Sequence, residues 1–216
     1  MSEHYHDTNS THELIEIYSP DGQPTGQAKP RSIIHQQGLW HKTVHTWILE
    51  TSTKRLLLQR RSPLKLNHPN QWDCSSAGHI SFGQASDEAA MREVEEELGL
   101  QISLQELGQP IGTMRVQLVL NEGTYLDNEF IDVYLVKREV VEVDKLKLQE
   151  SEVCDAQLVH YRVVEECYRK RHGDFVILDN VEEFKKEFFE RVAKELNDEG
   201  SSVDLDQVWP SFIPRV

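Results

Sequence analysis

The sequence contains few cysteines, no long apolar run, and far fewer basic than acidic residues. Its three cysteines, Cys74, Cys154 and Cys167, are odd in number and form no CxxC pair. This excludes a disulfide framework and predicts a cytoplasmic location. No apolar run approaches the roughly 18 residues that cross a bilayer, and the N-terminus lacks the apolar stretch of a secretory signal. We therefore expect no membrane partner.

The shortage of basic residues narrows the partners further. The 216 residues include 23 Lys and Arg against 37 Asp and Glu, a formal net charge of −14. Nucleic-acid backbones and anionic membranes need a basic surface, so neither is expected as a partner. Anionic small molecules are not excluded, because divalent cations bridge carboxylates to phosphates.

Periodicity predicts an α+β fold, with a mixed β-sheet flanked by helices and an added C-terminal helix. Strand formers separated by turn residues predict strands over 14–18, 44–50, 55–60, 111–120, 125–137 and 157–161. Helical spacing predicts helices over 85–98, 163–171 and 180–197, the last with an apolar stripe. We expect a flexible tail at 1–11, the main domain at 12–165, a helical extension packed on it at 166–199, and a tail at 200–216.

The helix over 85–98 carries a cluster of carboxylates. Ser86 is its expected N-cap and Gly99 its expected C-terminal glycine. At about 100° per residue, Glu93, Glu96 and Glu97 lie within an arc of about 100°. Like charges this close raise one another's pKa, and a bound Mg²⁺ or Mn²⁺ reverses that effect. The alternative is a solvated, Glu-rich amphipathic helix.

The spacing around this cluster resembles the Nudix box, G-x5-E-x7-R-E-U-x-E-E-x-G-U, where U is aliphatic. The matching residues are Gly78, Arg92, Glu93, Val94, Glu96, Glu97, Gly99 and Leu100. The resemblance implies a Nudix α/β/α sandwich. It also implies that Glu93, Glu96 and Glu97, with the main chain near Ala77, hold metal, and that Gly78, Arg92 and Gly99 support the box. One position departs from the box: its first Glu is Gln84, which can hydrogen-bond an Arg but cannot form an ion pair.

A wider resemblance links residues 12–165 to the isopentenyl-diphosphate-isomerase-like branch of that superfamily. It rests on the runs 38–47, 58–62 and 70–79. It implies a second divalent-metal site made of His35, His41, His79, Asp127 and Glu129. Asp127 and Glu129 are two apart on a predicted strand, so they point to one face. The alternatives are structural histidines and a solvated strand face.

The basic residues nearest the box in sequence are Arg60, Arg61 and Lys65. The resemblance implies that Arg61 and Lys65 hold the diphosphate of the substrate, and guanidinium groups suit that role. The alternative is a solvated hairpin end. True isomerases of this branch carry a catalytic Cys where this chain has Ala77, and Ala cannot move protons. Cys74 lies three residues upstream and is not expected to replace it.

These observations favour a Mg²⁺- or Mn²⁺-dependent hydrolase that cleaves a diphosphate linkage in a small nucleoside or organic diphosphate. A box Glu or Glu129 would take the proton of the attacking water. The alternatives are an isopentenyl-diphosphate isomerase and a non-catalytic diphosphate-binding module. We expect a monomer or homodimer. The loops over 24–42, 62–72 and 121–128 are expected to set specificity, and Trp47, Trp72, Phe82 and Tyr134 to belong to the core.

Overall fold

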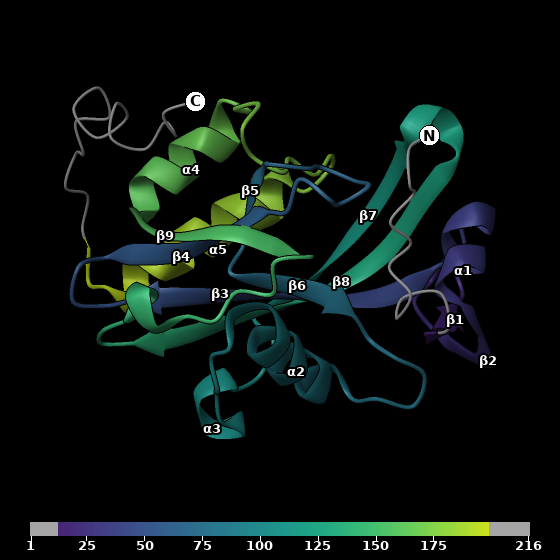
Figure 1. The fold of residues 1–216 in the computed structure, drawn as a ribbon, viewed down its shortest axis with the longest axis horizontal. Helices are drawn as coiled ribbons and strands as arrows, with labels where there is room; N and C mark the ends of the chain where they lie inside the picture. Colours follow the sequence, from purple (N-terminus) through teal and green to yellow (C-terminus); the bar gives the residue numbers. More distant parts are fainter. Residues whose placement is uncertain (1–12, 199–216) are drawn as a thin grey trace.

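The computed structural model describes residues 13–198 (Figure 1). Its centre is a seven-stranded mixed sheet with the order β5-β4-β3-β8-β7, to which β6 adds through β3 and β9 through β4. The strands are β3 (His41–Glu50), β4 (Arg55–Arg61), β5 (Trp72–Asp73), β6 (Ser76–His79), β7 (Gly112–Leu120), β8 (Tyr125–Arg138) and β9 (Val153–His160). The β3–β8 pair is parallel and the other pairs are antiparallel. A separate hairpin joins β1 (Leu14–Tyr18) to β2 (Pro24–Pro30).

Helices cover both faces of the sheet, which confirms the predicted α+β class (Figure 1). On one face lie α2 (Ser86–Leu98) and the short α3 (Leu104–Leu107). On the other lie α4 (Tyr161–Arg169) and α5 (Glu182–Glu195). The remaining helices are α1 (Arg31–Gln37) and the 3-10 turns η1 (Asn121–Gly123) and η2 (Val143–Lys145). Each face has its own apolar cluster, because alternate residues of β3 point to opposite sides.

A fork in the sheet positions the site. One edge of β3 pairs with β8 over its whole length. The other edge is shared: His41–Glu50 pairs with β6 near Thr43–Thr46 and with β4 near Ile48–Glu50. Since β4 and β6 take different halves of one edge, they separate from each other where both leave β3. The apolar face of α2, including Ala90, Val94 and Leu98, is buried beneath this fork.

Most predicted elements are confirmed, and the differences are local. The short elements β5, β6 and α3 were not predicted, and α4 begins and ends two residues before the predicted helix over 163–171. The predicted loop over 24–42 contains β2 and α1. Ser86 is not the N-cap of α2; Ala85 is, and the Ser86 hydroxyl instead donates to Asp132 at 2.9 Å. Phe82 was expected in the core but is 49% exposed, whereas Trp47, Trp72 and Tyr134 are buried. The predicted strand over 157–161 begins earlier, at Val153, because it pairs along the whole of β4.

The C-terminal helix packs as its apolar stripe indicates. Phe188 and Val192 are buried in the same cluster as Trp47 of β3, with Phe184 and Leu196 packed against it. The predicted domain boundary at residue 165 falls inside α4. The expected tails at 1–11 and 200–216 lie outside the described residues. Within residues 13–198, no helix has the length and apolar character needed to cross a membrane.

Candidate functional site

Glu97 occupies the fork between β4 and β6. It reaches up from α2, is 5% exposed, and accepts hydrogen bonds from the Ala77 amide at 3.1 Å and from Gln59 Nε2 at 3.3 Å. Burial, and then the nearby charge of Glu93, raise the pKa of Glu97 to about 8. The Ala77 amide and the Gln59 side chain therefore fix this carboxylate, while burial disfavours its negative charge.

Glu93 lies one turn earlier, against the backbone of Gly78. A Cβ atom at position 78 would stand 2.0 Å from Glu93 Cδ, so only glycine leaves room for this carboxylate. Burial raises the pKa of Glu93 to about 7, although Arg92 acts in the opposite direction. Glu96 is the outer member of the cluster, with a side chain 52% exposed. Two of the three clustered carboxylates are thus desolvated. A divalent cation binds most favourably to carboxylates in such a setting, because their charge is poorly screened by water.

Arg92 links the helix to the loop that precedes it. Its Nη1 lies 2.9 Å from both Glu93 Oε1 and Glu96 Oε2. Its Nη2 donates to the His79 carbonyl at 3.0 Å and to Gln84 Oε1 at 3.3 Å. Gln84 also accepts from the Ser81 amide at 3.3 Å, so it braces the loop without a charge.

Gly99 ends α2 as the box pattern indicates. Its φ of 64° is left-handed, and its amide donates to the Glu95 carbonyl at 2.9 Å. An added Cβ would stand 2.6 Å from Lys147 Cβ, so glycine is needed here for space as well as for conformation.

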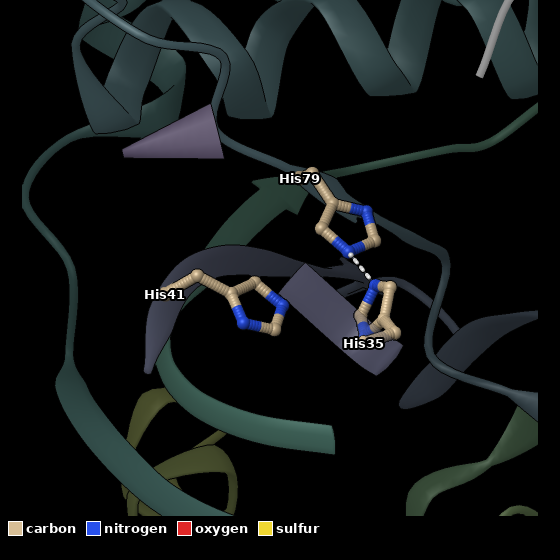
Figure 2. Close-up of side chains that lie close together, drawn as sticks. All are labelled: His35, His41 and His79. Carbon is tan, nitrogen blue, oxygen red and sulfur yellow. Dashed lines mark hydrogen bonds between the residues drawn. The ribbon is translucent and has the colours of Figure 1, made fainter. Parts of the chain in front are cut away.

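A second cluster joins α1, β3, β6 and β8. Figure 2 shows His35, His41 and His79 with their rings turned toward one another; the Nε2 atoms of His35 and His79 are 3.1 Å apart. Asp127 Oδ1 lies 3.3 Å from His35 Nδ1 and 3.7 Å from His41 Nε2. Glu129 Oε1 lies 3.6 Å from His41 Nε2. The shared strand face predicted for Asp127 and Glu129 is therefore present.

The donor atoms of this cluster fit a cation. His35 Nδ1, His41 Nε2 and Asp127 Oδ1 are buried and face one another at 3.3 and 3.7 Å, and within residues 13–198 none of them makes a well-directed hydrogen bond. His41 Nδ1 lies 3.0 Å from the Leu39 carbonyl, an arrangement that directs the lone pair of Nε2 inward. Imidazole nitrogens and carboxylates at these distances are ordinary ligands for a divalent transition metal.

Burial sets the direction of the pKa shift at His79, His35 and Glu129 of the second cluster. At His41 burial is outweighed by Glu129 and then Asp127, which raise its pKa, and at Asp127 burial is outweighed chiefly by His35, which lowers its pKa. Burial lowers the pKa of His79 well below the usual value, helped by the charge of Arg31, and it lowers the pKa of His35 against the pull of Asp127. Burial, and then the charge of Asp127, raise the pKa of Glu129 to about 7. Neutral imidazoles are the form that binds metal.

The three predicted basic residues are not equally placed. Lys65 pairs with Glu152, and its charge lowers the pKa of both Glu97 and His79, so it lies near both clusters. Arg61 contacts the Asn67 carbonyl and Asp73 Oδ2, each at 3.3 Å. Arg60 donates to the Asn70 carbonyl at 3.0 Å, and no contact brings it to either cluster within the described part of the chain.

Two residues near the second cluster were missed. Arg31 acts electrostatically on His35, His79, Asp127 and Glu129. The Tyr125 ring stacks on His35 with 4.2 Å between centroids. Spacing could have identified both, since Arg31 precedes His35 by one helical turn and Tyr125 precedes Asp127 by two residues on a strand.

Comparisons with known proteins agree with this geometry. The NUDIX domain model matches residues 39–180. Nudix hydrolase 3 of Arabidopsis thaliana is 36% identical over 204 residues, which cover 94% of this chain and 26% of that protein. An isopentenyl-diphosphate Delta-isomerase of Serratia proteamaculans is 32% identical over 122 residues, or 56% of this chain and 64% of the isomerase.

A solved structure shares the fold. A Deinococcus radiodurans protein superposes with a TM-score of 0.59 at 17% identity and covers 81% of this chain and 98% of its own. The chain spans about a quarter of the length of the Arabidopsis relative. The box geometry, the match over 39–180 and the shared fold lead to one conclusion: this chain belongs to the Nudix domain family.

Proposed function

We propose that this protein is a Mg²⁺- or Mn²⁺-dependent hydrolase that cleaves the diphosphate linkage of a nucleoside or organic diphosphate. The observation that carries the proposal is Glu97, a desolvated carboxylate held in the fork of the sheet by the Ala77 amide and Gln59, with Glu93 beside it. Family membership supports the same class of reaction.

Each residue then has a role. Glu93, Glu96 and Glu97, with the Ala77 carbonyl, would hold the cation. When bound, Mg²⁺ or Mn²⁺ would neutralise charge on the phosphate oxygens and lower the pKa of a water molecule. Glu129 or a box carboxylate accepts the proton of the attacking water. Lys65 and Arg61 orient the distal phosphate.

The second cluster is proposed as a separate divalent-metal site. His35, His41, His79, Asp127 and Glu129 would supply its ligands, and the buried nitrogen and oxygen atoms that face one another there support this role. A carboxylate bound to a metal is not free to accept a proton. Glu129 would therefore be a candidate general base only when this second site holds no metal, and otherwise a box carboxylate would take that role.

Isomerisation of isopentenyl diphosphate is the second candidate, since one relative is named for it. Two residues count against it. Ala77 has no ionisable group. The thiol of Cys74 is fully buried, donates to the Ser76 carbonyl at 3.3 Å, and has a pKa that burial raises well above its usual value. Conversion of isopentenyl to dimethylallyl diphosphate without phosphate release would establish the isomerase instead.

The decisive variant is Glu96→Gln combined with Glu97→Gln. It should abolish metal-dependent cleavage of the diphosphate linkage, monitored by separation of the products, in every member of a panel: nucleoside di- and triphosphates, isoprenoid diphosphates, nucleotide sugars and thiamine diphosphate. Glu95→Gln is the matched control, because Glu95 is exposed on the same helix and contacts only Gln101 among its side-chain partners. Full activity in the double variant, with the control unchanged, would refute the assignment.

A diphosphate-binding module without catalysis is the third candidate. Phosphate release from any panel member that stops in EDTA would eliminate it. The cytoplasmic location and the monomeric or homodimeric state remain predictions from the sequence.

A further inference from the structure

Lys185 is a buried cation that the proposed reaction does not use. It lies on the inner side of α5, is 9% exposed, and its Nζ stands 4.5 Å from the centre of the Tyr168 ring and 5.1 Å from that of Trp47. Among residues 13–198, no carboxylate forms an ion pair with it. The carboxylate whose charge acts on it, Asp73, is already paired with Arg61.

Burial of the Lys185 ammonium group without a paired anion is energetically unfavourable in the protein without a ligand. Removing an ammonium group from water is unfavourable unless an anion replaces the water, and two aromatic rings offset only part of that loss. Burial accordingly lowers the pKa of Lys185, with Cys74 and Asp73 acting in the opposite direction. A methionine would fill the same space at lower cost.

The surroundings of Lys185 lie beside the proposed catalytic carboxylates. Its charge acts on His45, Asp73 and Cys74, the same three residues on which Arg61 acts. The charge of Glu97 also reaches Cys74. Lys185 stands over Trp47 of β3, on the α5 face of the sheet. His45 lies two residues before Trp47 on the same strand and so points to that face too, while Glu97 enters the fork from α2 on the other side.

His45 and Ala77 mark a part of this sheet face that solvent reaches. His45 of β3 is the direct cross-strand partner of Ala77 of β6, so their side chains share one face of the sheet. Both residues are half-buried. The buried Nδ1 of His45 meets no hydrogen-bond partner in the part of the chain that the structure describes.

We propose that Lys185 is a specificity-determining residue whose ammonium binds an anionic group, a phosphate or carboxylate, on the organic part of the diphosphate substrate, with His45 beside it. This inference rests on the proposed function and narrows its substrate class. The protein then prefers organic diphosphates that carry a second anionic group over apolar ones, and it rejects cationic ones. A fixed ammonium group also opposes the positive charge that forms when an alkene is protonated.

Binding rather than turnover provides the test, so that its result does not depend on hydrolysis. Calorimetry in Ca²⁺ would compare three probes: phosphoribosyl diphosphate, isopentenyl diphosphate and thiamine diphosphate, whose organic parts are anionic, apolar and cationic. The variants are Lys185→Met and Lys185→Arg. Lys186→Met is the matched control, since Lys186 is the next residue of α5 and its side chain is 77% exposed.

Wild type and Lys186→Met should bind phosphoribosyl diphosphate most tightly and thiamine diphosphate least. Lys185→Met should lose roughly 10-fold or more in affinity for phosphoribosyl diphosphate, the loss of one charge-assisted hydrogen bond, while binding of isopentenyl diphosphate is unchanged or improves. Lys185→Arg should keep most of the preference. The same order of affinities in Lys185→Met as in wild type, or an equal loss for all three probes, overturns the inference. Should the affinities behave as expected while no probe is hydrolysed in Mg²⁺ or Mn²⁺, only the hydrolytic function fails.

Discussion

The contact between Gly78 and Glu93 provides a sharp test of the site. Gly78→Ala would place a methyl group 2.0 Å from Glu93 Cδ and 2.1 Å from its Oε1. Helix α2 cannot retreat, because Ala89, Ala90 and Val94 on its other face are fully buried. The Glu93 side chain must therefore rotate away from the fork.

The size of the effect follows from that displacement. Ordinary van der Waals contact begins at 3.4 Å, so Glu93 Cδ must move by at least 1.4 Å, the difference from 2.0 Å. Misplacing a reacting or ligand group by about 1 Å costs on the order of 100-fold in rate, or about 3 kcal/mol of transition-state stabilisation. The free energy of unfolding should change less, by a loss of about 1 kcal/mol, because only the end of a flexible side chain moves and the backbone stays in place.

The assay is kcat/KM for diphosphate hydrolysis at saturating Mg²⁺, together with urea unfolding. Gly173→Ala is the control, since an added Cβ there meets nothing within 4 Å. A Gly78→Ala protein with at least a third of the activity of Gly173→Ala would refute the reasoning. A variant that lost activity only because it unfolded would refute it as well, and the unfolding curve would show this.

Three further predictions follow from the two clusters. In EDTA, Glu97 has a folded pKa of about 8, raised from 4.5, so its contribution to stability is complete below pH 4.5 and is lost as pH rises toward 8. Wild type should therefore lose more unfolding free energy between pH 5 and 8 than Glu97→Gln, and equal losses in urea titrations would contradict this. His41→Gln should weaken Mn²⁺ binding at the second cluster by about 10-fold or more, measured by calorimetry with the box disabled by Glu96→Gln and Glu97→Gln; unchanged affinity would remove His41 from the ligands. Gln84→Glu should change kcat by less than about 5-fold, because Gln84 already accepts from Arg92 and Ser81 and a half-exposed ion pair adds about 0.2–1 kcal/mol; a larger gain in kcat would show that the amide limits the enzyme.

The α+β class, the helix over 85–98 and the family were readable from the sequence because they depend on local spacing. Carboxylates at positions 93, 96 and 97 share one side of any helix, and Asp127 and Glu129 share one face of any strand. Gly99 was identified as the end of the helix and has that role, whereas the close approach of Glu93 to Gly78 became visible only in the structure. Misplaced details such as the Ser86 cap arose where a distant partner, Asp132, competed for a local hydrogen bond.

Local pattern thus settles which residues share a face of one element, because backbone geometry repeats over a few residues. Which of these faces meet depends on how distant segments pack. The fork of β3, β4 and β6 buries Glu97 and leaves Glu96 in solvent, and packing of α5 brings Lys185 to the residues around Asp73 from more than 100 positions away. Those outcomes depend on contacts between distant segments, whose burial and charge no local pattern encodes.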